Sequence, residues 1–310
     1  MDKLQAMEVF VQVVDSGGFT RAAEHMHMPK ATVSTLIQAL ETALSVKLLN
    51  RTTRRVSVTA DGAAYYERCL RILADVQDTE ESLSSSHASP SGRLRVDVPT
   101  GLGLQVIIPA LPQFFARYPD ILLEMGCGDR PVDLIEEGID CVVRAGELAD
   151  SSLIARRVGA LSFATCAAPS YIERYGRPLH PNELLRHQCV NYFSAKTGNI
   201  IEWDFAKQGE RIQIALPGTI AVNNSDAYMV AGLSGLGVMQ AATFALQQHV
   251  DAGRLELLLE DWCTDPLPLH VVYPQNRHLS GKVRAFVEWI AELFTDSPAL
   301  QVAQPRLVGG

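Results

Sequence analysis

Residues 29–41 read PKATVSTLIQALE and predict a helix with two unlike faces. The apolar stripe recurs at spacings of three and four and consists of Val33, Leu36, Ile37, Leu40 and Leu44. Pro29 suits the first position of this helix, because its fixed φ is already helical and its missing N–H is not needed there. The opposite face is short or amide-tipped and consists of Lys30, Ala31, Ser34, Thr35 and Gln38. A small polar face of this kind can enter the major groove of DNA, where amide, hydroxyl and ammonium groups meet base edges.

Two further helices are expected before this stretch. The first covers about residues 4–15, whose apolar positions share one face, and Gly17 and Gly18 end it. Thr20 is expected to cap a short second helix, whose alanines allow a neighbouring helix to approach closely. The order predicted up to residue 44 is therefore helix, helix, turn and helix.

Residues 47–59 read KLLNRTTRRVSVT and predict two short β segments around a basic tip, which is a wing. Arginine and threonine at such a tip suit phosphate oxygens or a narrow minor groove. A polar helix face or a basic loop taken singly indicates only solvated surface. The order helix, helix, turn, helix and basic wing disfavours that interpretation. Residues 1–59 are predicted to form a winged helix-turn-helix that binds double-stranded DNA, with these residues in its wing: Arg51, Thr53, Arg54 and Arg55.

Charge is unevenly distributed along the 310 residues, whose net charge is −8. That total argues at first sight against a nucleic-acid partner. Residues 16–72, however, hold eight basic and four acidic side chains, so this segment is locally +4. Attraction to phosphate is screened beyond a Debye length of about 8–10 Å, so DNA binding depends on the charge of this segment more than on the net charge of the chain.

A long helix is expected from Thr59, its N-cap, to about residue 83. Its heptad-like seam indicates either pairing between subunits or packing onto its own domain, and palindromic DNA half-sites favour pairing. The Ser-rich residues 84–92 predict a flexible hinge. The seam consists of Tyr66, Cys69, Leu73, Val76 and Leu83.

Residues 92–296 alternate strand and helix patterns and predict an α/β architecture with a mainly parallel sheet. The tail after Asp296 is expected to be disordered. Strands are expected at residues 94–99, 121–125, 140–144, 162–167, 212–222 and 269–273, with helices near 132–137 and 282–294.

The composition is that of a soluble protein, with 47% hydrophobic and 20% charged residues. No apolar run approaches the ~20 residues of a membrane span, and the N-terminus has no secretory signal pattern, so the cytoplasm is expected. The six cysteines lack the spacing of a zinc site and are expected to be buried, reduced thiols. No metal or cofactor is predicted.

At four stretches the chain closely resembles the LysR-type transcriptional regulators of bacteria: residues 20–23 (TRAA), 29–41, 49–55 (LNRTTRR) and 58–62 (VTADG). The resemblance implies a second half like periplasmic binding proteins, with two α/β lobes, an effector cleft between them, and crossovers near 160–163 and 265–268. It also implies a homodimer or homotetramer.

The expected organisation follows from this resemblance. A DNA-binding domain covers residues 1–59, and a linker helix for dimerisation with a hinge covers 60–91. The effector-binding domain covers 92–296, with lobe I at about 92–161 and 267–296 and lobe II at about 162–266. A tail of residues 297–310 follows.

The resemblance also predicts cleft residues. Thr100, Gly101 and Gly103 would present donors at a helix N-terminus, which is an anion site, and Asn224 and Ser225 would face it from the other lobe. Thr100 can alternatively just cap its helix. Arg144, at a strand end, can pair with a carboxylate effector or with a nearby aspartate.

The competing interpretation is an α/β enzyme of a two-lobed fold with an accessory DNA-binding head. Residues 100–103 (TGLG) lack the third glycine of a dinucleotide-binding loop, there is no P-loop, and residues 232–235 (GLSG) miss the nucleophile-elbow spacing. No catalytic residue is therefore predicted. A secreted solute-binding protein would need an export signal.

Overall fold

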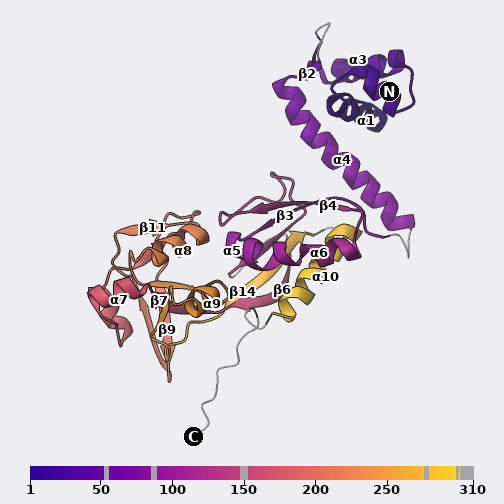
Figure 1. The fold of residues 1–310 in the computed structure, drawn as a ribbon. Coiled ribbons are helices and arrows are strands. Elements are labelled where there is room, and N and C mark those ends of the chain that lie inside the picture. The colour runs from indigo at the N-terminus through magenta and orange to yellow at the C-terminus, as the bar shows by residue number, and fades with distance from the viewer. Residues whose placement is uncertain (52–55, 85–88, 147–152, 276–278, 298–299, 301–310) are drawn as a thin grey trace. The chain divides into compact units, whose positions relative to one another are not determined.

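The computed structural model describes residues 1–51, 56–84, 89–146, 153–275, 279–297 and 300 (Figure 1). The chain divides into two compact units, Met1–Ala88 and Ser89–Gly310. The helices described in the first unit are α1 (Lys3–Asp15), α2 (Phe19–His25), α3 (Lys30–Leu44) and α4 (Ala60–Ser84). Between α3 and α4, β1 (Leu49–Arg51) pairs antiparallel with β2 (Val56–Val58).

The helix starts differ in part from those expected. Asp2 caps α1 by accepting from the Leu4 and Gln5 N–H groups at 3.0 and 3.3 Å. Thr20 is not a cap, since α2 begins at Phe19 after Gly18. Pro29 is the N-cap residue of α3, so the helix begins at Lys30, one position after the predicted start, because the Pro29 ψ of 135° is extended. Sequence spacing locates a helix, but its first residue depends on backbone geometry.

The predicted apolar stripes meet in one core. Val9 and Phe10 of α1 and Val33 and Ile37 of α3 are fully buried together with Leu48, just before the hairpin. Removal of these side chains from water stabilises the unit by roughly 1.5–3 kcal/mol each. The core orients α3 by holding one of its faces.

The start of α4 is fastened to this core. Thr59 is its N-cap as predicted, since the hydroxyl oxygen accepts from the Gly62 N–H at 2.9 Å. Cys69 is buried in the core of the first unit, which is called the head below, and the Tyr66 hydroxyl donates a hydrogen bond to Asp15 of α1. The first part of the predicted seam therefore packs onto its own domain.

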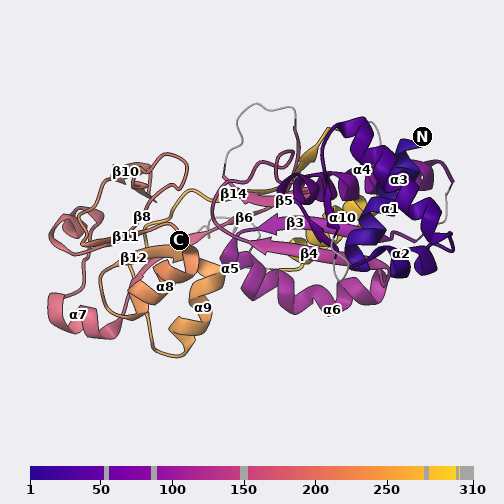
Figure 2. The ribbon, with the colours of Figure 1, turned by 90° about the horizontal axis from the view of Figure 1, so that it is seen from above.

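The second unit contains a five-stranded sheet in the order β4-β3-β5-β14-β6 (Figure 2). Strand β3 (Gly92–Val98) runs parallel to β4 (Ile121–Cys127) and β5 (Cys141–Ala145), whereas β14 (Leu267–Pro274) runs antiparallel to β5 and β6 (Leu153–Leu161). The sheet is therefore mixed, and the expectation of a mainly parallel sheet is wrong. The direction of β14 depends on the point at which the chain re-enters this sheet. The alternation of strand and helix patterns along the sequence does not reveal that point.

Helices cover one side of the five-stranded sheet. The chain leaves β3 as α5 (Thr100–Leu102), continues through a π-helical segment (Gly103–Ile107) and becomes α6 (Ile108–Arg117). Phe114 of α6 contacts Phe286 and Trp289 of α10 (Gly281–Thr295), with ring centroids 5.9 and 4.9 Å apart. The predicted closing helix is thus confirmed.

The expected helix near residues 132–137 is wrong, because residues 134–138 form turns. The Asp133 carboxylate accepts from the Ile135 and Glu136 N–H groups, which caps a single turn. Gly138 then adopts a φ of 64° and reverses the chain before helix can propagate.

A second group of elements lies between β6 and β14 in sequence. Strands β7 (Phe163–Ala167), β12 (Met239–Ala242) and β13 (Glu256–Leu258) form one antiparallel sheet. Strand β8 (Val190–Tyr192) pairs parallel with β11 (Ile220–Val222), and β9 (Trp203–Lys207) forms a hairpin with β10 (Glu210–Ile214). The single strand expected at 212–222 is therefore two strands in different sheets. The helices described here are α7 (Pro169–Tyr175), a 3-10 helix (Pro181–Arg186), α8 (Ser225–Leu233) and α9 (Thr243–Asp251).

The six cysteines are all free, and four of them are buried as expected. Cys127 and Cys263 are exposed, so the expectation is wrong for these two. Cys127 ends the edge strand β4, and Cys263 lies in the connection from β13 to β14. Within the described ranges, no helix is both long and apolar enough to cross a membrane.

Candidate functional site

One face of α3 is turned toward solvent. Lys30, Ala31, Thr35 and Gln38 are exposed, and Ser34 is half-buried. The Thr35 hydroxyl donates to the Ala31 carbonyl at 2.9 Å, whereas the Lys30 and Gln38 side chains make no hydrogen bond or ion pair with another described residue. The predicted groove-facing residues thus share one surface that a ligand can reach.

The wing hairpin lies directly after α3. Leu49 pairs with Val58 and Arg51 with Val56, so the two strands of the wing are as predicted. The tip predictions Thr53, Arg54 and Arg55 lie outside the described residues, and Arg51 is described by its backbone alone.

Glu41 joins α3 to the base of the wing, and sequence reasoning assigned it no role. It is 3% exposed and accepts from the Leu48 and Leu49 N–H groups at 2.9 and 3.2 Å and from Lys47 Nζ at 3.0 Å. Burial by itself raises the pKa of Glu41, but these hydrogen bonds outweigh it and hold the pKa below its ordinary value. The sequence does carry a signal for this role of Glu41. Glu41 lies four residues after Ile37, so it is a carboxylate on the apolar face of the helix.

A cavity of about 500 Å³ lies in the second unit and is lined from both groups of strands. This volume suits a small molecule. Gln105 and Ala145 contribute from the five-stranded sheet and its helix, and Gln240 and Ser225 from the other group. The aromatic side chains in the lining are Phe163, Tyr192, Trp203, Tyr228 and Phe244.

Three of the predicted cleft residues line this cavity: Gly101, Arg144 and Ser225. Thr100 is buried behind the lining, and Asn224 caps α8 by accepting from the Asp226 and Ala227 N–H groups at 3.1 and 3.0 Å. Gly103 faces away from the cavity, since an added Cβ would lie 2.8 Å from the Cys127 sulfur. Gly103 is therefore a packing position in this structure.

The expected anion position is occupied by a side chain of the protein itself. Asp129 accepts from the Thr100 N–H at 3.0 Å and from the Ser225 N–H at 2.6 Å, so it bridges the first turns of α5 and α8. The Tyr192 hydroxyl faces the same carboxylate, and burial together with this charge and hydrogen bond raises the pKa of Tyr192. Asp129 follows β4, at the edge of the sheet where the parallel strand β3 also ends, and that placement is the sequence signal for it.

Arg144 has the second of its two predicted partners, an aspartate. Its Nη2 lies 2.9 Å from Oδ1 of Asp97, which is 8% exposed. Burial raises the pKa of Asp97 even though Arg144 opposes that shift. The guanidinium is therefore engaged in a structural ion pair beside the cavity.

A winged helix-turn-helix joined to an α/β unit that encloses a cavity of ligand size is the architecture of an effector-responsive DNA-binding regulator. Residues 4–63 match the family described as "Bacterial regulatory helix-turn-helix protein, lysR family", and residues 87–295 match the "LysR substrate binding domain". The chain belongs to the LysR-type transcriptional regulators, as the sequence motifs indicated.

Similar proteins extend over almost the whole chain. An HTH-type transcriptional repressor of Pseudomonas aeruginosa is 41% identical over 97% of this chain and 95% of its own length. The activator AaeR of Escherichia coli is 32% identical over 96% of this chain and 95% of its own.

Solved structures show the same architecture. CrgA of Neisseria meningitidis is 34% identical with a TM-score of 0.59, over 93% of this chain and 97% of that one. Full-length AphB of Vibrio cholerae is 29% identical with a TM-score of 0.58, over 93% and 98%. The chain is therefore a LysR-type regulator with a DNA-binding head and an effector-binding domain.

Proposed function

We propose that α3 enters the major groove with Lys30, Ser34, Thr35 and Gln38 at base edges and Ala31 against the groove wall, while Arg51, Thr53, Arg54 and Arg55 of the wing contact the DNA backbone. The observation that supports this most is the exposed polar face of α3, whose opposite face is held in the core. Short side chains allow close approach, and the Gln38 amide and the Lys30 ammonium suit the donors and acceptors of base edges.

Replacement of Gln38 by alanine tests the groove contact. We expect the affinity for a duplex recovered by selection from a random library to fall by about 1–3 kcal/mol, roughly 5- to 150-fold, with relaxed preference at one base pair. Titrations of labelled duplex measure both effects. Gln248→Ala is the matched control, because Gln248 is exposed on α9 in the second unit. Equal affinities of the Gln38→Ala and Gln248→Ala proteins for the duplex would contradict the proposal that Gln38 on α3 contacts DNA.

The wing is tested by its salt dependence. The double variant Arg51→Ala with Arg54→Ala should bind more weakly to all duplexes alike. The slope of log affinity against log salt should decrease by about 1 for each phosphate that the wing no longer neutralises. Unchanged binding of this variant contradicts the role of the wing.

We further propose that the cavity binds a small effector without converting it, and that binding shifts the packing of subunits and hence the DNA complex. The organisation proposed is a head at residues 1–59, a linker helix and hinge at 60–91, and an effector domain at 92–296. Two heads on a near-palindromic site require a homodimer or a dimer of dimers in the cytoplasm. Sedimentation of the full chain with and without duplex distinguishes these assemblies from a monomer.

A further inference from the structure

The backbone donors expected to bind an anionic effector are already in use. Thr100 and Ser225 donate their N–H groups to Asp129, and Gly101 donates to the Ser225 hydroxyl at 3.2 Å. The next two N–H groups of α8 donate to Asn224. A carboxylate from outside would have to displace one that the protein supplies itself.

The two cations in the lining are also paired. Arg144 contacts Asp97, and Arg130 forms two parallel hydrogen bonds with Glu137 at 3.0 and 2.6 Å. The bidentate Arg130–Glu137 pair uses the same donor geometry that would recognise an effector carboxylate. In the described lining of the cavity, no other arginine or lysine is available for an anion.

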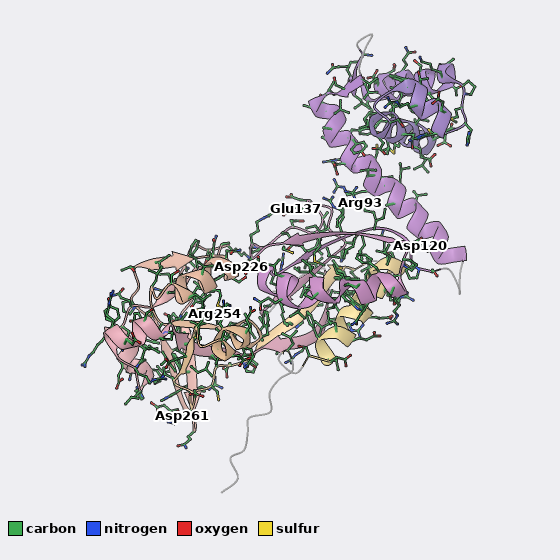
Figure 3. The ribbon with its side chains drawn as sticks, in the orientation of Figure 1. Arg93, Asp120, Glu137, Asp226, Arg254 and Asp261 are labelled. Atoms are coloured by element: carbon green, nitrogen blue, oxygen red, sulfur yellow. The ribbon has the colours of Figure 1, made fainter. Side chains whose placement is uncertain are left out.

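The lining has an excess of carboxylates instead. Asp226 is half-buried in the first turn of α8, at the boundary between the two groups of strands (Figure 3), and Glu202 is exposed just before β9. For neither carboxylate is an ion pair or side-chain hydrogen bond found among the described residues. Asp265, by contrast, pairs with Arg211, and Asp204 accepts from the Asp265 N–H at 2.8 Å.

Aromatic rings form much of the remaining wall. Tyr192 and Tyr228 pack edge to face with centroids 5.7 Å apart, and Trp203 and Phe244 also line the cavity. The face of an aromatic ring carries partial negative charge, so it attracts cations and packs against apolar groups but does not attract anions. The charge and the walls of the cavity thus favour the same chemistry.

We propose that the effector is a small organic cation, with an ammonium or guanidinium group held by Asp226 and Glu202 and an apolar body against the aromatic wall. Asp129 occupies the position that an effector carboxylate would take. This inference rests on the proposed effector role of the cavity and names the class of its ligand.

Three probes of similar size and different charge test it on the full-length protein: 2-phenylethylammonium, 3-phenylpropionate and 3-phenylpropan-1-ol. Calorimetric titration at pH 7 should give the ammonium probe an affinity at least about tenfold above the other two. Asp226→Asn should reduce that affinity about tenfold, whereas Asp120→Asn, an exposed carboxylate in the turn before β4, should leave it unchanged (Figure 3). Circular dichroism checks that both variants are folded.

Asp129→Ala provides the reciprocal test. Removal of this carboxylate frees the Thr100 and Ser225 N–H groups, so acetate and 3-phenylpropionate should bind the variant and raise its melting temperature in a saturable way. The parent protein should show neither response.

Tighter binding of 3-phenylpropionate than of 2-phenylethylammonium to the parent protein, or no binding of the ammonium probe, overturns the cation assignment. Absence of a carboxylate response in Asp129→Ala overturns the role given to Asp129. Selected-duplex affinity is measured in the same samples: a protein that binds DNA and prefers the carboxylate probe refutes only the ligand class, whereas failure of all three probes also counts against the cavity as an effector site.

Discussion

Glu41→Ala is expected to lower the free energy of unfolding of the head by about 2–4 kcal/mol, because it leaves the buried Leu48 and Leu49 N–H groups without this acceptor. The ion pair with Lys47 contributes less. The Lys47 side chain is 76% exposed, and exposed pairs contribute roughly 0–1 kcal/mol. Glu41→Gln retains an acceptor oxygen and should therefore lose far less stability than Glu41→Ala.

Hydrogen exchange resolved to residues 40–51 measures this effect in the full chain. In Glu41→Ala the Leu48 and Leu49 amides should lose protection, and affinity for DNA should fall because the wing is no longer fastened to α3. Glu8→Ala is the control, since Glu8 is an exposed carboxylate on α1. Full protection of both amides in Glu41→Ala would contradict this account of the wing.

The same carboxylate predicts a pH dependence. The pKa of Glu41 is lower in the folded head than its ordinary value, so its contribution to stability is present above the unfolded pKa of about 4.3. It is lost as pH falls through the lowered folded value. The stability difference between the parent protein and Glu41→Gln should therefore shrink below about pH 4.

Gly62→Ala is expected to destabilise the head by about 3 kcal/mol, although alanine is the better helix former by about 1 kcal/mol. Gly62 lies in the first turn of α4, where an added Cβ would be 2.0 Å from the Leu48 carbonyl oxygen and 3.1 Å from the Thr59 hydroxyl. Hydrogen bonds hold both neighbours in place, because the Thr59 hydroxyl donates to the Lys47 carbonyl at 2.7 Å and the Leu48 carbonyl accepts from the Thr59 N–H at 3.0 Å. The clash with backbone therefore outweighs the gain in helix propensity.

Thermal unfolding by calorimetry tests this prediction, with Gly281→Ala as the control. Gly281 begins α10, and among the described residues its added Cβ would approach Pro90 alone, at 4.0 Å. The control should unfold at or slightly above the parent temperature. A Gly62→Ala protein that is as stable as the control would show that α4 can move away from Leu48 without loss.

Local periodicity predicted the helices and the hairpin of the first unit, but not every helix start. The stripe from Val33 to Leu40, the hairpin sequence at residues 49–58 and the cap at Thr59 act over a few residues, so the chain itself specifies them. Glu41 was missed because its partners lie seven and eight residues ahead, where helix periodicity no longer applies. The helix starts at Phe19 and Lys30 were missed for another reason, because the first residue of a helix depends on the backbone geometry of the residue before it.

The sequence by itself determined the family, a helix with one apolar and one polar face, and the presence of an α/β domain with backbone donors at residues 100–101. Only the tertiary structure decided what those donors bind, because Asp129 and Ser225 are 29 and 124 residues away from Thr100 and Gly101 respectively. Contacts between distant parts of the chain also pair Arg144 with Asp97 and place Gly103 against Cys127. Charge type at each position can be read along a chain, but which charges remain unpaired in a cavity depends on distances that exist only after folding.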